Sequence, residues 1–256
     1  MKAHVINLAR SPERRAHMLR ELRKVGIEYE FVEGVDGRDV DLSDTSLVSP
    51  TWQGRSPFLV GAVGCALSHQ KVWGKVLQDG AERALILEDD VILPADMNAL
   101  VEAVAMRTEG AEAVLLHYFG GSRPEQRLQL RGSSQLSPSR VLALPTDIGR
   151  LGGTGAYILT RDACQRMAKI MLPIRFPADD WAFFCNEGAI DRLHCVAPMP
   201  VRINTGFRST IGHYGTSTFQ TRLREAVIKV PLVSHALTIR RQRIIGRMTH
   251  VELVDD

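Results

Sequence analysis

The 256-residue chain has few cysteines, no long apolar run and almost no excess charge. Its four cysteines are widely spaced without a Cys-x-x-Cys pair, which argues against a disulfide framework or a zinc ribbon. No apolar stretch approaches the roughly 20 residues that span a bilayer. The first residues lack the apolar core and cleavage site of a signal peptide. These absences predict a cytoplasmic protein, and the formal net charge of only +3 predicts no binding to nucleic acid.

Strand-like and helix-like segments alternate through the first two thirds of the chain. An apolar strand at 4–8 precedes a helix that Ser11 can cap, with Pro12 at its first position and Gly26 as its terminator. Alternating residues at 27–31 predict the next strand. Further strands are expected at 84–87, 113–119 and 155–159, and helices at 63–77, 95–106 and 161–171. This order predicts an α/β fold with a mostly parallel sheet and helices on both faces.

Two polar, turn-rich segments, 38–57 and 122–139, are predicted to be loops, the second of them a functional lid or an excursion. We expect one domain over residues 1–215 and a basic, helical tail over 216–256. Apolar and basic residues mix between 227 and 247. Such a segment can pack on the domain or lie on an anionic membrane surface.

The run Glu88-Asp89-Asp90, which directly follows an apolar strand, is the most informative local feature. Carboxylates packed this closely need a compensating partner, such as a divalent cation. In a continuing strand, Glu88 and Asp90 project to one face and Asp89 to the other. The paired hard oxygens then suit Mg²⁺ or Mn²⁺ holding a phosphate-bearing ligand. The alternative interpretation is a solvated acidic turn.

Four sequence motifs, in order over about residues 3–182, resemble glycosyltransferase family 25, which includes lipooligosaccharide glycosyltransferases and collagen galactosyltransferases. The resemblance implies a GT-A-type nucleotide-sugar fold, a UDP-sugar donor, often UDP-galactose, and inversion at the anomeric carbon. The motifs are Ile6-Asn7-Leu8-Ala9-Arg10 with Arg14-Arg15, Gly61-Ala62-Val63-Gly64-Cys65-Ala66-Leu67-Ser68-His69 with Trp73, Leu87-Glu88-Asp89-Asp90, and Gly153-Thr154-Gly155-Ala156-Tyr157.

The end of the first strand supplies candidates for donor binding, because ligands of open α/β sheets bind outside the carboxyl ends of the strands. Asn7, with Leu8 beside it, could meet the uracil edge or ribose, and Arg10 and Arg14 the diphosphate. The alternative for Arg14 is an exposed position on the first helix.

The helix after Gly61 carries Cys65, His69 and Trp73 on one face. Cys65 and His69 have a spacing suited to zinc, but no second pair completes a tetrahedral site. Core packing is the preferred interpretation for Cys65 and Trp73, whereas the resemblance suggests that Ser68 and His69 approach the donor.

Asp179 and Asp180 are the candidates for the catalytic base, because inverting transfer needs a carboxylate that takes the acceptor hydroxyl's proton. One of the two could instead cap the helix that follows, and the resemblance favours Asp179 as the base. Gly153 and Thr154 are predicted to line the donor sugar or acceptor, and Trp181 to stack on a sugar.

The sequence therefore predicts an inverting, metal-dependent hexosyltransferase that uses a UDP-sugar, with galactose or glucose transferred to a glycan or glycolipid such as lipopolysaccharide core. Glu88, Asp89 and Asp90 would hold the diphosphate with Mn²⁺ or Mg²⁺, with Glu88, Asp90 and His213 as candidate metal ligands. The expected location is cytoplasmic, at the periphery of the inner membrane. Two alternatives stay open: a metal-dependent nucleotidyltransferase or phosphohydrolase, and a non-catalytic carbohydrate-binding protein.

Overall fold

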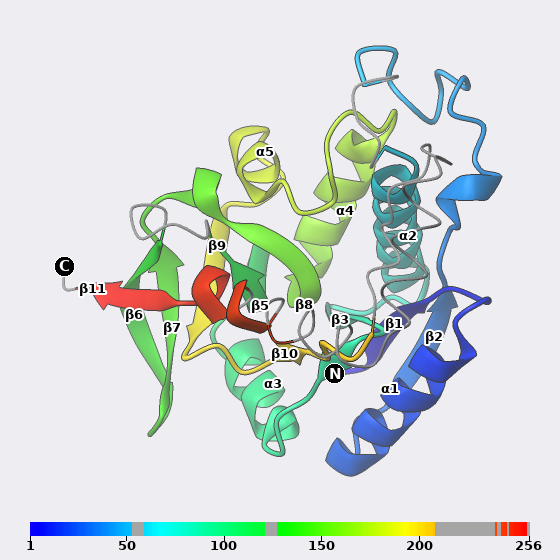
Figure 1. Cartoon of the computed structure of the whole chain (residues 1–256). Helices are drawn as coiled ribbons and strands as arrows, with labels where there is room; N and C mark the ends of the chain where they lie inside the picture. The colour runs from blue at the N-terminus through cyan, green and yellow to red at the C-terminus, as the bar shows by residue number, and fades with distance from the viewer. Residues whose placement is uncertain (53–58, 121–126, 208–238, 240–241, 245, 255–256) are drawn as a thin grey trace.

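The computed structural model describes residues 1–52, 59–120, 127–207, 239, 242–244 and 246–254 (Figure 1). Among them, nine strands form one sheet in the order β11-β6-β7-β9-β5-β8-β3-β1-β2. Its strands are β1 (Ala3–Asn7), β2 (Tyr29–Glu33), β3 (Arg83–Glu88), β5 (Glu112–Phe119), β6 (Leu128–Ser137), β7 (Arg140–Pro145), β8 (Gly152–Thr160), β9 (Arg192–Ala197) and β11 (Val251–Val254). Two short strands, β4 (Val91–Ile92) and β10 (Arg202–Ile203), pair separately.

The sheet is mostly parallel. β1 runs parallel to β2 and β3, β5 to β9, and β6 to β11. β8 is antiparallel to both β3 and β5, and β7 to both β6 and β9. Seven of the nine strands therefore point the same way, with β7 and β8 reversed.

Helices cover both faces of this sheet (Figure 1). Leu85 and Leu87 of β3 belong to the core cluster that contains residues of α1 (Pro12–Val25) and α3 (Met97–Ala105). The alternate residues, Ala84 and Ile86, belong to the cluster with α2 (Leu59–Gln78), α4 (Arg161–Met171) and α5 (Trp181–Asn186). This alternation follows from the two-residue period of a strand. The predicted α/β class is confirmed.

The first βαβ unit agrees closely with its sequence signals. Pro12 is the first residue of α1, and Gly26 ends the helix in the left-handed conformation with φ of 67°. The Gly26 N–H donates to the Leu22 carbonyl, as a terminating glycine commonly does. Ser11, by contrast, makes no side-chain capping bond, so that expectation was wrong.

The predicted loop at 122–139 was also wrong over most of its length. Residues 128–137 form β6, which pairs antiparallel with β7, and 121–126 lie outside the described residues. Leu128 and Leu130 are buried, whereas Gln129 and Arg131 are exposed. This short alternation signals a strand, although Gly132 and Pro138 suggest a loop.

The end of the chain returns to the sheet. β11 pairs parallel with β6, so the last part of the predicted tail contributes a strand. Residues 242–244 and 246–248 are helical, and 208–238, which include His213 and the start of the tail, lie outside the described residues. No helix in the described ranges has the length and apolar character needed to cross a membrane.

Two methionines test the packing of α3 against the sheet. Met97 is fully buried, whereas Met106, just after the same helix, is 77% exposed. We expect Met97→Ala to lower the free energy of unfolding by about 2–5 kcal/mol, because a cavity replaces the side chain. The same change at Met106 should stay within about 0.5 kcal/mol. Urea denaturation of both variants measures their free energies of unfolding, and equal losses would contradict the burial of Met97 against the sheet.

Candidate functional site

The candidate residues gather where β1 and β3 end and β8 begins. Because β8 runs against β3, its first residues lie beside the carboxyl end of β3, with Leu87 opposite Ala156. Asn7 is the last residue of β1 and Glu88 the last of β3. The carboxyl edge of such a sheet is where ligands bind in open α/β folds.

Asp89 is held by a buried ion pair. The Arg14 guanidinium of α1 donates to Asp89 Oδ1, and the Asn7 side-chain amide donates to Asp89 Oδ2 at 2.8 Å. Arg14 and Asp89 are 4% and 7% exposed. Burial raises the pKa of Asp89, and the contacts with Arg14 and Asn7 oppose that rise. Arg14 is therefore not an exposed helix residue, and it neutralises a carboxylate that would otherwise be costly to bury.

Asp90 shares the same guanidinium. Its Oδ2 lies 3.2 Å from the second terminal nitrogen of Arg14. The backbone carbonyl of Asp90 accepts a hydrogen bond from the Asn204 N–H at 2.6 Å, just after β10. The Phe207 ring lies with its centroid 5.2 Å from the Arg14 guanidinium carbon. The segment after β10 thus packs beside the acidic run.

The predicted geometry of the acidic run is half correct. Glu88 and Asp89 do point to opposite sides, toward α2 and α1 respectively. Residues 89 and 90 form a turn, however, so the strand period ends at Glu88. Asp90 therefore contacts Arg14 together with Asp89 rather than returning to the contacts of Glu88.

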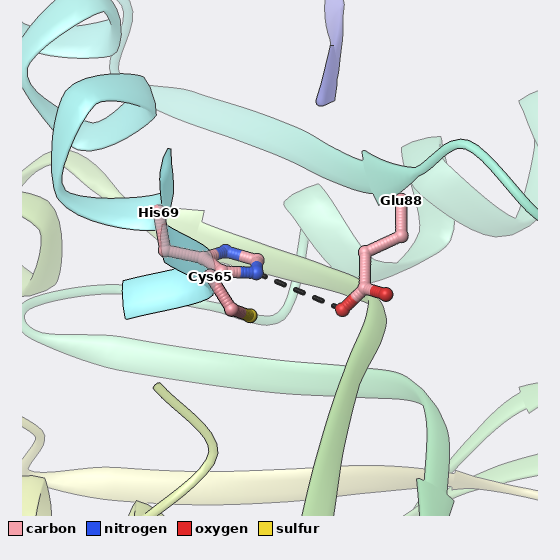
Figure 2. Close-up of side chains that lie close together, drawn as sticks. All are labelled: Cys65, His69 and Glu88. Atoms are coloured by element: carbon pink, nitrogen blue, oxygen red, sulfur yellow. Dashed lines mark ion pairs between the residues drawn. The ribbon is translucent and has the colours of Figure 1, made fainter. Parts of the chain in front are cut away.

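Glu88 is the acidic residue at the centre of the site. Its Oε1 accepts a hydrogen bond from the Thr154 hydroxyl at 2.6 Å. The same oxygen lies 3.7 Å from His69 Nε2 (Figure 2). The Glu88 side chain is 29% exposed, so a ligand can reach it. Burial raises the pKa of Glu88, but pairing with His69 and the Thr154 hydrogen bond outweigh burial and hold it below its ordinary value. Glu88 is thus kept as a carboxylate.

The His69 imidazole is fixed by two aromatic residues of the core. His69 Nδ1 lies 2.7 Å from the Tyr157 hydroxyl, which also accepts a hydrogen bond from Trp73 Nε1 at 3.0 Å. All three side chains are buried. The predicted core position of Trp73 is confirmed, and its contact with Tyr157 helps to direct the other imidazole nitrogen, Nε2, toward Glu88.

Two side chains near Glu88 had no predicted place in the site. Cys65 is half-buried, and burial together with the charges of Glu88 and Asp179 raises the pKa of its thiol, which a Thr154 hydrogen bond partly offsets. His117 of β5 is buried, and burial lowers its pKa to about 4 although the Glu88 charge opposes this. The sequence could have indicated His117 as a site residue, because it is a histidine within the otherwise apolar strand 113–119.

The Asp179-Asp180 pair divides into two roles. Asp180 caps α5, because its Oδ1 accepts from the Phe183 N–H at 3.0 Å. Asp179 Oδ2 instead accepts from the Gly153 N–H at 3.0 Å. Gly153 has a φ of 103°, a conformation that side chains disfavour. Asp179 is therefore the member of the pair that lies beside the start of β8.

Trp181 does not present a ring for sugar stacking, and that prediction was wrong. The side chain is fully buried, its Nε1 donates to the Gly153 carbonyl at 3.1 Å, and its ring meets that of Tyr157 edge to face at 5.3 Å. Trp181 therefore supports the backbone at Gly153 from within the core.

Ser68 also has a structural role in place of the predicted donor contact. Its hydroxyl donates to the Gly64 carbonyl at 2.6 Å and accepts from the Val35 N–H at 2.8 Å. A Cβ at Gly64 would lie 2.6 Å from the Gly37 nitrogen, so this glycine permits close packing of α2 on η1 (Gly37–Asp39).

Arg10 and Leu8 lie just beyond Asn7 at the end of β1. Arg10 Nε donates to Asp36 Oδ2 at 2.5 Å, and its side chain is 36% exposed. Leu8 is half-buried. Both residues lie at the predicted edge of the sheet, and Asp36, which no motif indicated, orients Arg10.

The chain matches known sequences of one family. Residues 1–182 match the profile of glycosyltransferase family 25 (LPS biosynthesis protein). A glycosyltransferase 25 family member of Aedes aegypti is 33% identical over 135 residues, 48% of this chain and 21% of that protein. Human procollagen galactosyltransferase 2 is 37% identical over 94 residues, 34% of this chain and 15% of that protein.

A mouse relative is named inactive glycosyltransferase 25 family member 3; it is 38% identical over 96 residues, 34% of this chain and 16% of that protein. The chain thus spans about a fifth or less of the length of these relatives. A solved glycosyltransferase involved in the glycosylation of the major capsid of PBCV-1 aligns over 76% of this chain and 80% of that chain. The two chains are 11% identical in sequence, with a TM-score of 0.34.

The sheet and the helices on both its faces define an α/β fold, and the profile match over residues 1–182 assigns its family. The chain belongs to glycosyltransferase family 25. The membership that the four motifs predicted is thereby confirmed.

The buried ion pair yields a stability test with a matched control. Arg14→Met leaves Asp89 and Asp90 adjacent without their cation, so we expect a loss of about 3–5 kcal/mol in the free energy of unfolding. Arg166→Met removes an exposed pair with Asp191 at 2.8 Å and should cost about 0–1 kcal/mol. Chemical denaturation at neutral pH compares the two, and an Arg14 variant as stable as the control would contradict the structural role.

Proposed function

We propose that the chain is an inverting, metal-dependent glycosyltransferase that transfers a hexose from a UDP-sugar to a glycan acceptor. The observation that carries this proposal is the meeting of Glu88, Thr154 and Asp179 around the start of β8, in a member of glycosyltransferase family 25. The galactosyltransferase name of the human relative favours galactose, with glucose second.

The donor nucleotide would bind along the end of β1. Arg10, partly exposed and oriented by Asp36, would meet the diphosphate, and Leu8 would contact the nucleoside. Asn7 and Arg14 have their nitrogens engaged with Asp89. We therefore assign these two residues and Asp89 to positioning the acidic run, with Glu88 and Asp90 as the side chains that serve the donor.

A divalent cation would be held by Glu88 and Asp90. Asp90 pairs with Arg14 through Oδ2, apart from the contacts of Glu88, so its other oxygen, Oδ1, would have to face the ion. Carboxylate oxygens are the ligands that Mn²⁺ and Mg²⁺ prefer, and the half-buried, ionised Glu88 carboxylate meets this requirement. Thr154 orients Glu88, and Arg14 orients Asp90. When bound, the ion would neutralise charge developing on the departing diphosphate.

Asp179 would act as the general base. The acceptor hydroxyl oxygen forms the new bond to the anomeric carbon while the bond to the UDP oxygen breaks, and the hydroxyl proton passes to the Asp179 carboxylate. The Gly153 N–H holds one oxygen of that carboxylate at 3.0 Å. With Gly153 and Thr154 at the start of β8, the sugar and acceptor would lie between Asp179 and Glu88.

The acceptor is proposed to be a glycan or glycolipid of the lipopolysaccharide-core class, in keeping with the family description. Basic residues after β10 would bring the enzyme to an anionic membrane surface, on the cytoplasmic side of the inner membrane.

Product analysis separates the main alternative function from glycosyl transfer. UDP released together with a glycosylated acceptor means glycosyl transfer, whereas pyrophosphate or free phosphate means nucleotidyl transfer or phosphate hydrolysis. Failure to bind UDP in calorimetry with Mn²⁺ present would favour a non-catalytic protein, a role consistent with the name of the mouse relative.

The adjacent aspartates provide a matched test of the base. Asp179→Asn removes the proton acceptor, so we expect kcat to fall on the order of 10²–10⁴-fold. Asp180→Asn keeps a good capping residue and should retain most of the activity. UDP release with UDP-galactose and a core oligosaccharide measures both variants. Equal losses, or a greater loss for Asp180→Asn, would contradict the assignment.

Metal dependence is tested by removing and restoring the ion. Treatment with EDTA should abolish transfer, Mn²⁺ should restore it, and Asp90→Asn should require more Mn²⁺ for half-maximal activity because one charged ligand is lost. Asp96→Asn changes a more exposed aspartate beyond β4 and should respond to Mn²⁺ as the wild type does. Unchanged activity after EDTA would rule out the metal role.

A further inference from the structure

A sulfur, a nitrogen and an oxygen from two elements meet beside the proposed donor site. Cys65 and His69 lie one helical turn apart on α2, and Glu88 ends β3. One ligand atom of each lies within 4.8 Å of the other two. Figure 2 shows the three side chains directed toward a common point, with His69 Nε2 3.7 Å from Glu88 Oε1.

These three groups form a ligand set of the kind that binds zinc. Thiolate, imidazole and carboxylate are the usual protein ligands of Zn²⁺, and three of them with one open position are typical of non-structural sites. Bonds of roughly 2.0–2.3 Å in tetrahedral geometry place neighbouring ligand atoms roughly 3.3–3.8 Å apart. The observed separation of 3.7 Å between the histidine nitrogen and the glutamate oxygen is slightly longer than the roughly 3.3–3.5 Å expected for a nitrogen and an oxygen ligand, so a small side-chain movement would close it. The sulfur lies within 4.8 Å of both atoms, and a side-chain adjustment of at most about 1 Å would bring it to the spacing of a zinc ligand.

The surrounding hydrogen bonds orient two of the ligands. Tyr157 Oη has two lone pairs, so it can accept from Trp73 Nε1 and also from a protonated His69 Nδ1. In that tautomer Nε2 gives up the proton with which it pairs with Glu88, and its lone pair becomes available to a metal ion. The Thr154 hydroxyl fixes the Glu88 carboxylate in the same way. Metal ligands are commonly held by such outer partners, which set both tautomer and direction.

We propose that Cys65 Sγ, His69 Nε2 and Glu88 Oε1 form a Zn²⁺ site with a fourth position open to solvent or ligand. Binding breaks the Cys65 S–H bond: the thiolate keeps the electron pair and coordinates the ion, and the proton leaves to solvent. The site overlaps the proposed Mn²⁺ or Mg²⁺ site at Glu88 alone. Zn²⁺ bound by the thiolate would therefore compete with the ion that serves the donor.

A second group of three possible metal ligands among the described residues is less suited to Zn²⁺. His4, Glu30 and Asp79 also lie within reach of one another, but Lys2 and Lys75 form ion pairs with both carboxylates. Their charge is already balanced, and no sulfur is present. The set on α2 and β3 is thus the one suited to a thiolate-bound ion.

Cobalt(II) substitution tests the site without donor or acceptor, so its outcome is separate from that of the transferase proposal. Co²⁺ added to the reduced 256-residue chain should give a thiolate-to-cobalt charge-transfer band that saturates at one equivalent and disappears when Zn²⁺ is added. Cys65→Ser should lose the band. Cys185→Ser, the same change at another half-buried free cysteine, should keep it.

A second variant tests the orientation of His69 and keeps Cys65 in place. Tyr157→Phe removes the hydroxyl beside Nδ1, and we expect Co²⁺ affinity to fall about 10–100-fold with the band still reached at saturation. Circular dichroism checks that each variant is folded. No thiolate band in the wild type, an undiminished band in folded Cys65→Ser, or unchanged affinity in Tyr157→Phe would each overturn the proposed coordination.

Discussion

The arrangement of the site depends on one buried cation, the Arg14 guanidinium. Three consecutive carboxylates at the end of a buried strand repel one another and resist desolvation. Arg14 contacts both Asp89 and Asp90 and is supplied by the first helix after β1. The ion pairs therefore join the N-terminal βα unit to β3 and leave Glu88 as the acidic residue directed to the other side. Without that cation, burying Asp89 and Asp90 side by side would be strongly unfavourable.

Strand alternation explains why neighbouring acids have different chemistry. Even-numbered residues of β3 face α2 and α4, and odd-numbered residues face α1 and α3. Glu88 consequently meets His69 and Thr154, with access to solvent, whereas Asp89 meets Arg14 and Asn7 inside the protein. A shift of one residue in the register of β3 would exchange these environments.

The sequence was sufficient where the signal is local. The period of β3, Pro12 and Gly26 at the ends of α1, and Thr160 as the cap of α4 all correspond to the structure. The edge hairpin β6–β7 was missed because its alternation is short and interrupted by Gly132. Contacts between distant segments were harder to predict from the sequence. The position of Trp181 beside two acids suggests an exposed ring, whereas the folded structure buries it against Tyr157. Likewise, the separate roles of Asp179 and Asp180 depend on where β8 begins.

The reversed direction of β8 has a consequence for how this edge of the protein can vary. β3 and β1, which run parallel to each other and opposite to β8, finish there, whereas β8 starts there and contributes a backbone N–H at Gly153. This edge of the sheet is therefore formed by the ends of β1 and β3 together with the start of β8. A change in the η3 (Ile148–Arg150) connection could reshape the glycine-rich wall while the acidic run, encoded some sixty residues earlier, stays untouched. Two independently variable stretches of sequence therefore meet at a single surface.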